Sequence, residues 1–199
     1  MANAPVPIPA YAELAARRGL RYEPDADERW IRAWEPYTTL KVPHRYEHAM
    51  QATGEVGSVT IARMVMSLEN VHDGVSRSYD VSSWIVIAQD VRVVAGAAAT
   101  SDPRSAFSEP LDLVTSPRRP TGDAAFDRVF ASFSKTPEEL AEAINPSLRK
   151  LTLGWRAPLH FELRKGGFVL APVALGADPT ALAWLVDAVH LFGSKASRR

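Results

Sequence analysis

The first forty residues alternate between a proline-rich stretch and segments with helical spacing of apolar positions. Residues 1–8 are rich in proline and predict a flexible, extended arm. Pro9 is suited to the first turn of a helix, and the stretch that follows predicts a short helix ending at Gly19. A second helix is predicted over residues 29–34, because an acid and a glutamate spaced as in a capping box stand just before it.

The middle of the chain changes to the spacing of strands. Over residues 39–89 apolar positions nearly alternate and β-branched residues are frequent, which predicts strands. Residues 53–57 contain two glycines and predict a hairpin connection, and residues 70–74 predict another turn. Residues 82–89 predict a strand buried on both faces, and residues 91–99 predict a further strand.

An irregular connection and a well-marked helix come next. Residues 101–122 are rich in proline and predict a long connection around one short strand, residues 111–115. Thr136 and Pro137 predict the start of a helix, since threonine caps a first turn and proline fits the first helical position. We expect this helix to end near Ile144, before a second helical piece.

The last third predicts a hairpin followed by a helix. In residues 159–164 apolar residues alternate with polar ones, which predicts a strand with one buried face and one solvated face carrying His160 and Glu162. The Gly166-Gly167 pair matches a two-residue turn, and residues 168–175 are expected to return antiparallel.

These elements together predict the α+β fold class. Strands joined by hairpins favour a largely antiparallel sheet, packed by N-terminal, middle and C-terminal helices. We expect residues 1–8 to form the arm, residues 9–194 to form a single α+β domain, and residues 195–199 to form a basic tail. No glycine-rich phosphate-binding fingerprint follows any predicted strand, so we expect no cofactor.

Composition excludes several functions. The 199 residues include no cysteine, so disulfides, thiolate metal sites and cysteine nucleophiles are impossible. The 23 basic and 23 acidic residues balance, which argues against a nucleic-acid partner. No apolar run is long enough to span a bilayer. The first residues do not have the pattern of a secretory signal, so we expect a cytoplasmic protein.

One segment carries a motif of catalytic metal sites. His44, Glu47 and His48 match H-x-x-E-H, the inverted zinc-peptidase motif. On a helix the two imidazoles lie about 6 Å apart and could bind one zinc while Glu47 polarises a water. On a strand they lie about 13 Å apart and cannot converge. The flanking residues favour a strand on a solvated or partner-facing surface, so we predict no metal site and no catalytic residue. The alternative takes Glu47 as catalytic residue and His44, His48 and Glu69 as metal ligands.

Four short motifs along the chain carry a resemblance. They are Arg-Gly-Leu-x-Tyr (residues 18–22), Gly-x-x-Gly (54–57), Phe-Asp-x-x-Phe (126–130) and Glu-Leu-x-x-Gly-Gly (162–167), the last before an amphipathic helix. In this layout the chain resembles uncharacterised bacterial proteins that carry a domain of unknown function. The resemblance implies a bacterial source and one continuous domain, and it implies no activity.

The leading hypothesis is a non-enzymatic binding or assembly protein. Hairpins leave exposed strand edges, which suit pairing with a protein partner or with a second copy. A zinc-dependent hydrolase built on residues 44–48 is the first alternative, and zinc retained after purification without chelator would support it. The second alternative is a small-molecule-binding domain with its pocket between the sheet and the last helix.

Overall fold

The computed structural model describes most of the chain. The described residues are 8–26, 45–54, 57–72, 75–101, 116–155, 157–172, 175 and 178–197. The helices are α1 (Ile8–Arg17), α3 (Ala124–Val129), α4 (Pro137–Ala143), α5 (Pro146–Trp155) and α6 (Pro179–Ala196). The strands are β1 (Arg21–Asp25), β2 (Arg45–Gly54), β3 (Gly57–His72), β4 (Val75–Gln89), β5 (Ala97–Thr100), β6 (Ala131–Phe133), β7 (Leu159–Arg164) and β8 (Gly167–Pro172).

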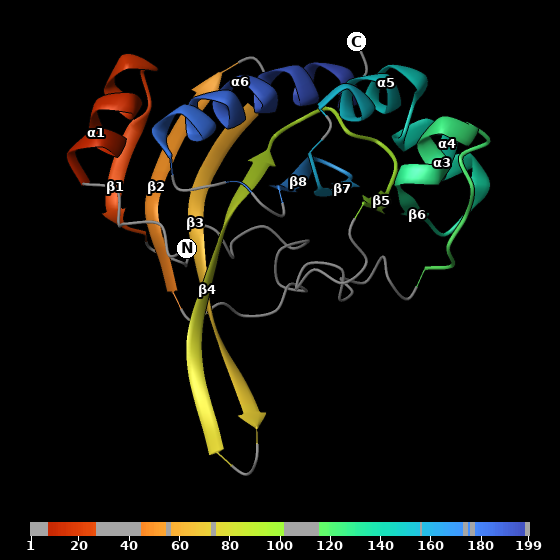
Figure 1. Cartoon of the computed structure of the whole chain (residues 1–199). Coiled ribbons are helices and arrows are strands. Elements are labelled where there is room, and N and C mark those ends of the chain that lie inside the picture. The colour runs from red at the N-terminus through yellow and green to blue at the C-terminus, as the bar shows by residue number, and fades with distance from the viewer. Residues whose placement is uncertain are drawn as a thin grey trace.

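The strands form one eight-stranded sheet in the order β1-β2-β3-β4-β8-β7-β5-β6. Each pair of neighbours runs antiparallel. Helices lie at the N-terminus, in the middle and at the C-terminus, and α6 crosses one face of the sheet beside α1 and α5 (Figure 1). The predicted α+β class with an antiparallel sheet is therefore confirmed. None of the described helices is long and apolar enough to cross a membrane.

The two faces of the sheet are both buried near its centre. On the face under the helices, large side chains such as Trp84, Phe161 and Phe192 form the main core. On the opposite face Met64 and Ile85 belong to a smaller cluster, whose other buried members are Tyr46, Ala49, Ala62, Ile87, Val169 and Ala171. Both faces of the sheet are thus buried near its centre, whereas antiparallel sheets commonly have one face exposed to solvent.

The helix signals in the sequence act as predicted. Helix α1 ends at Arg17, and the turn that follows contains Gly19, whose φ of 66° is readily adopted by glycine. The hydroxyl of Thr136 accepts a hydrogen bond of 3.1 Å from the amide of Glu139, which caps α4. Arg18 and Asp187 join the first and last helices through two hydrogen bonds of 2.6 and 3.0 Å.

Two glycines fix the hairpins. Gly57 pairs with Gly54 at the β2–β3 turn, and a Cβ at Gly57 would lie 2.0 Å from the carbonyl oxygen of Gln89, so a side chain is excluded there. The β7–β8 hairpin is confirmed, but its turn lies one residue earlier than predicted. Residues 165–166 connect the strands and Gly167 already pairs with Arg164.

Other expectations differ in detail. Residues 21–25 form the edge strand β1, which the sequence pattern did not predict. Residues 91–96 are irregular, so the strand predicted over 91–99 is wrong for most of its length. The physical reason is a loop bonded to the β7–β8 turn, where the amide of Val91 donates to the carbonyl of Gly166. The helix predicted over 29–34 and the strand predicted over 111–115 lie outside the described residues.

Candidate functional site

The segment with the histidine motif is extended. Strand β2 begins at Arg45, and His44 lies outside the described residues. The register with β3 shifts between Glu47 and Met50. At this point two residues of β2, His48 and Ala49, lie opposite a single residue of β3. This is a β-bulge. His48 takes a φ of 54°, a left-handed conformation that few residues other than glycine adopt.

The bulge places His48 in an aromatic cluster under α1. The hydroxyl of Tyr22 and Nδ1 of His48 lie 2.9 Å apart, and the ring of Tyr11 is 4.7 Å from the imidazole. The ring of Tyr11 also meets Trp84 edge-on at 5.6 Å. Burial lowers the pKa of His48, and burial raises the pKa of Tyr11 and of Tyr22. The lowered pKa favours the neutral imidazole, whose Nδ1 forms a hydrogen bond with the hydroxyl of Tyr22.

Glu47 is engaged by two arginines. Nε of Arg45 lies 2.7 Å from one carboxylate oxygen, and a guanidinium nitrogen of Arg63 lies 3.6 Å from the other. Arg45 also reaches Asp80 at 3.2 Å, and Ser67 donates to Asp80 at 2.7 Å. These five residues form an ion-pair network across β2, β3 and β4. The carboxylate that the alternative hypothesis takes as a catalytic base is here part of this network.

The structure keeps two of the proposed zinc ligands, His48 and Glu69, apart. Ala62 of β3 lies opposite the bulge that contains His48, and Glu69 lies seven positions further along the same strand. Seven residues of extended strand span about 23 Å, which is the separation between Glu69 and the bulge along β3. Among the described residues no group of three or more histidine, aspartate or glutamate side chains could hold a metal ion. Since His44 lies outside those residues, the zinc alternative stays a prediction to be tested by metal analysis.

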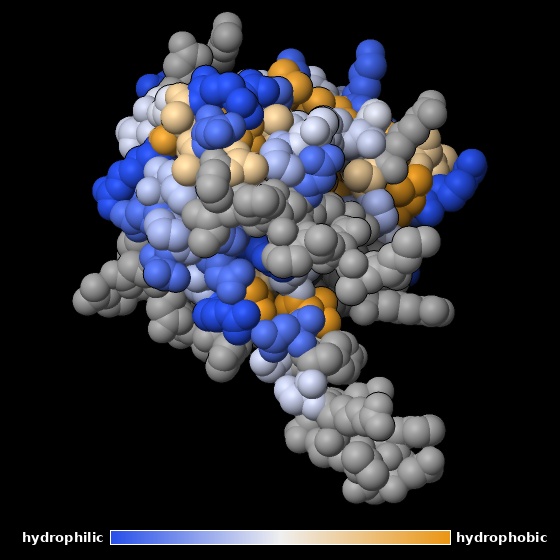
Figure 2. Space-filling view, turned by 60° about the vertical axis from the view of Figure 1, so that its left-hand side comes forward, coloured by the Kyte–Doolittle hydropathy of each residue, from blue (hydrophilic) through white to orange (hydrophobic). Residues whose placement is uncertain are grey.

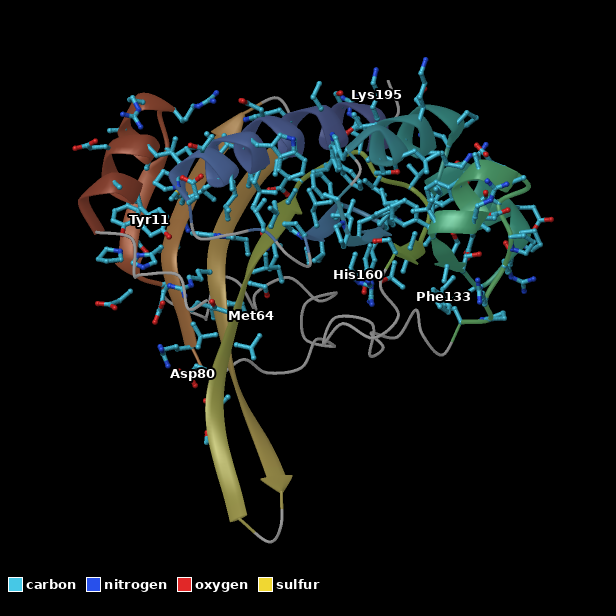
Figure 3. All side chains as sticks on the ribbon, in the orientation of Figure 1. Tyr11, Met64, Asp80, Phe133, His160 and Lys195 are labelled. Atoms are coloured by element: carbon cyan, nitrogen blue, oxygen red, sulfur yellow. The ribbon has the colours of Figure 1, made fainter. Side chains whose placement is uncertain are left out.

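The face of β7 that carries His160 is buried, so the prediction of a solvated face is wrong. His160 and Glu162 are each 2% exposed. Nε2 of His160 lies 2.9 Å from Glu162, and Arg164 lies 3.5 Å from the other carboxylate oxygen. Figure 3 shows His160 on the side of the sheet away from α5 and α6. The carboxylate is paired on both sides, which is what a buried charge requires.

Strands β3 and β4 extend well beyond their neighbours in the sheet. The ladder with β2 ends at Val65, and the ladder with β8 covers only residues 86–89 of β4. Beyond these limits residues 66–72 and 75–81 pair with each other and with no further strand in the described part of the chain. We call these two segments the ribbon. It projects from the body of the molecule in Figure 1.

The register fixes which positions of the ribbon share a face. Antiparallel pairing places Met66 opposite Val81 and Leu68 opposite Tyr79, and strand alternation puts these positions, with the pairs Asn70–Arg77 and His72–Val75, on the face that carries Met64 in the body. The other face has the pairs Ser67 with Asp80, Glu69 with Ser78, and Val71 with Ser76. Val81 is 37% exposed. A two-stranded ribbon is marginally stable alone in water, which favours a binding role for it.

Part of this surface was visible in the sequence. The predicted turn at residues 70–74 and the alternation of Met64 and Met66 already place the tip of the hairpin and one of its faces. The projection itself depends on where β2 and β8 stop, which no local pattern reveals. Figure 3 places Met64 and Asp80 near the point where the ribbon leaves the body.

Two surface hollows lie away from the ribbon. One, of about 440 Å³, is lined by charged residues of both signs, among them Lys135, Glu139 and Arg164. The other, of about 490 Å³, is mostly apolar and includes Phe130 and Leu153. No α6 residue lines either hollow, so neither corresponds to the predicted pocket between the sheet and the last helix. On the face seen in Figure 2, orange areas are small and separate.

The fold and the site together define a class: an α+β protein with one antiparallel sheet and a projecting two-stranded ribbon. No family model matches the chain, and no curated protein matches it in sequence. The chain is similar in structure to the mycobacterial trehalose monomycolate transport factor A, TtfA, with a TM-score of 0.53 and 9% identity. The match covers 94% of this chain and 92% of TtfA. At this identity the likeness shows a shared fold, and that fold occurs in a bacterial protein.

Proposed function

We propose that the protein acts by binding, as an accessory component of a protein assembly, and that the ribbon is its binding element. One observation carries the proposal: in the described part of the chain β3 and β4 continue past both neighbouring strands, and Val81 is exposed where the ribbon begins. No further described strand pairs with either long edge of the ribbon, and another strand can complete such an edge.

The ion-pair network supports this role. It joins Arg45 of β2 to Asp80 of β4 across the base of the ribbon. Contacts that limit the motion of a binding element reduce the conformational entropy that it loses when a partner arrives. The fold of TtfA, which is named as a transport factor, supports an accessory role in a transport assembly.

Site-specific photo-cross-linking tests the proposal. A photoreactive residue is placed at Ser78, which is exposed on the ribbon. The matched control places it at Ser147, which is also exposed and lies on α5. In cells that make the protein at its native level, we expect adducts from position 78 whose sequenced peptides map to one defined protein. We expect none from position 147. Equal yields from both positions, or none from position 78, would overturn the proposal.

A further inference from the structure

The hollow beside the β7–β8 turn gathers charged residues from separate parts of the chain. Its volume of about 440 Å³ lies within the range of about 300–1,000 Å³ that is usual for small-molecule sites. Its walls are the loop at residues 94–96, the start of α4 with the residues before it, and the β7–β8 turn. The charged residues of the lining are Lys135, Glu139, Glu142, Arg164 and Lys165.

Three of these charges have no ion-pair partner within the described part of the chain. Arg164 lies 3.5 Å from Glu162, and both Arg164 and Glu142 take part in further interactions, so these two opposite charges are already engaged. In contrast, Lys135, Lys165 and Glu139 form no ion pair with any described residue. The hollow therefore offers two ammonium groups and one carboxylate to a ligand.

We propose that this hollow binds a small molecule with two anionic groups and one ammonium group, the charge pattern of a free amino dicarboxylic acid. Lys135 and Lys165 attract the two carboxylates of the ligand, and Glu139 attracts its ammonium group. A concave surface focuses the field of such charges, and hydrogen bonds between ionised groups are the stronger ones. A pattern of both signs also selects against ligands that lack one of the three groups.

Hydrogen bonds tie the backbone of each wall to its surroundings. The amide of Gly166 donates to the carbonyl of Val93 at 3.0 Å, which joins the β7–β8 turn to the loop before β5. A guanidinium nitrogen of Arg119 donates to the carbonyl of Lys135 at 3.0 Å, and the next residue, Thr136, caps α4. These bonds reduce the conformational entropy that the walls lose when a ligand binds.

An NMR titration of the ¹⁵N-labelled full chain tests the site. With L-glutamate we expect shifts at the amides of Gly96 and Lys165 that saturate at one site per chain. Glutarate keeps both carboxylates and lacks the ammonium group, whereas γ-aminobutyrate keeps the ammonium group and lacks one carboxylate. Each should bind about tenfold more weakly than L-glutamate, because each leaves a charged group of the hollow unpaired.

Two variants assign the charges to residues. We expect Lys165→Gln to weaken L-glutamate about tenfold, and Lys150→Gln, at an exposed position on α5, to leave its affinity unchanged. Glu139→Gln removes the partner of the ammonium group, so this variant should bind L-glutamate and glutarate equally. Its matched control is Glu138→Gln, exposed on the same helix and outside the lining, which should keep the preference for L-glutamate.

Several outcomes would overturn the proposal. They are shifts that do not saturate, shifts confined to residues away from the hollow, equal affinities of the wild-type chain for L-glutamate and glutarate, and a preference for L-glutamate that survives Glu139→Gln. The lining residues of the hollow lie outside the ribbon, so none of these results bears on the binding role proposed for the ribbon.

Discussion

His48 shows how one residue can be placed by the backbone and held by its neighbours. Its left-handed φ of 54° is unfavourable for a residue with a side chain, and the bulge that imposes it points the imidazole at Tyr11 and Tyr22. The aromatic cluster therefore depends on the bulge.

A pH dependence of stability follows from this environment. Burial lowers the pKa of His48 in the folded protein below its value in the unfolded chain. Its contribution to stability is therefore complete above the unfolded pKa and is lost as the pH falls through the folded pKa. In urea titrations between pH 7.5 and 5, we expect His48→Asn to flatten the fall in the free energy of unfolding. His190→Asn, at an exposed helical position, should leave the slope unchanged, and equal slopes for all three proteins would contradict the prediction.

Glu162 leads to a second prediction at the scale of the residue. Its carboxylate lies between His160 and Arg164 and is 2% exposed. Removing one partner of a buried charge pair costs about 3–5 kcal/mol, so we expect Glu162→Ala to lower the free energy of unfolding by that amount. Glu162→Gln, which keeps the shape, should lose less. A loss for Glu162→Ala no larger than for Glu138→Ala, an exposed control on α4, would show that the pairing contributes little.

At the scale of the element, the ribbon is separable from the sheet. Ser67 and Asp80 face each other at its base, so an Asn-Gly turn can join them and replace residues 68–79. Among the described strands the removed positions pair only with one another, and we expect the thermal midpoint of the shortened chain to change by no more than about 2 °C. Circular dichroism at low protein concentration measures this. A large drop would mean that the ribbon is part of the cooperative core.

The elements also show what the sequence could predict. Thr136 and Pro137 mark the start of α4, and the glycines near residues 54–57 mark a hairpin, because these residues act through local backbone geometry. The burial of His160 could not be predicted from the sequence. Alternation in β7 shows that one face of the strand is apolar and the other polar, but it does not show whether the polar face is also buried. The bulge at His48 leaves no local signal either, because its residue is not glycine.

At the scale of the whole molecule, one sheet unites all the described parts. Helices cover one face, a second cluster occupies the other, and β3 and β4 run through both the body and the ribbon. The fold resembles that of TtfA over 94% of this chain at 9% identity, so the likeness concerns the fold alone.

The length of β3 and β4 has a consequence for how the protein responds to proteolytic cleavage. Local opening at the far end of a long hairpin breaks few contacts, so a protease would reach the residues near the tip while the rest stays folded. A single cut there divides the polypeptide in two, yet the pieces remain bound through residues 57–65 and 82–89 of the same two strands. The cut molecule would thus keep its shape, and an unchanged mobility on a native gel would conceal the break.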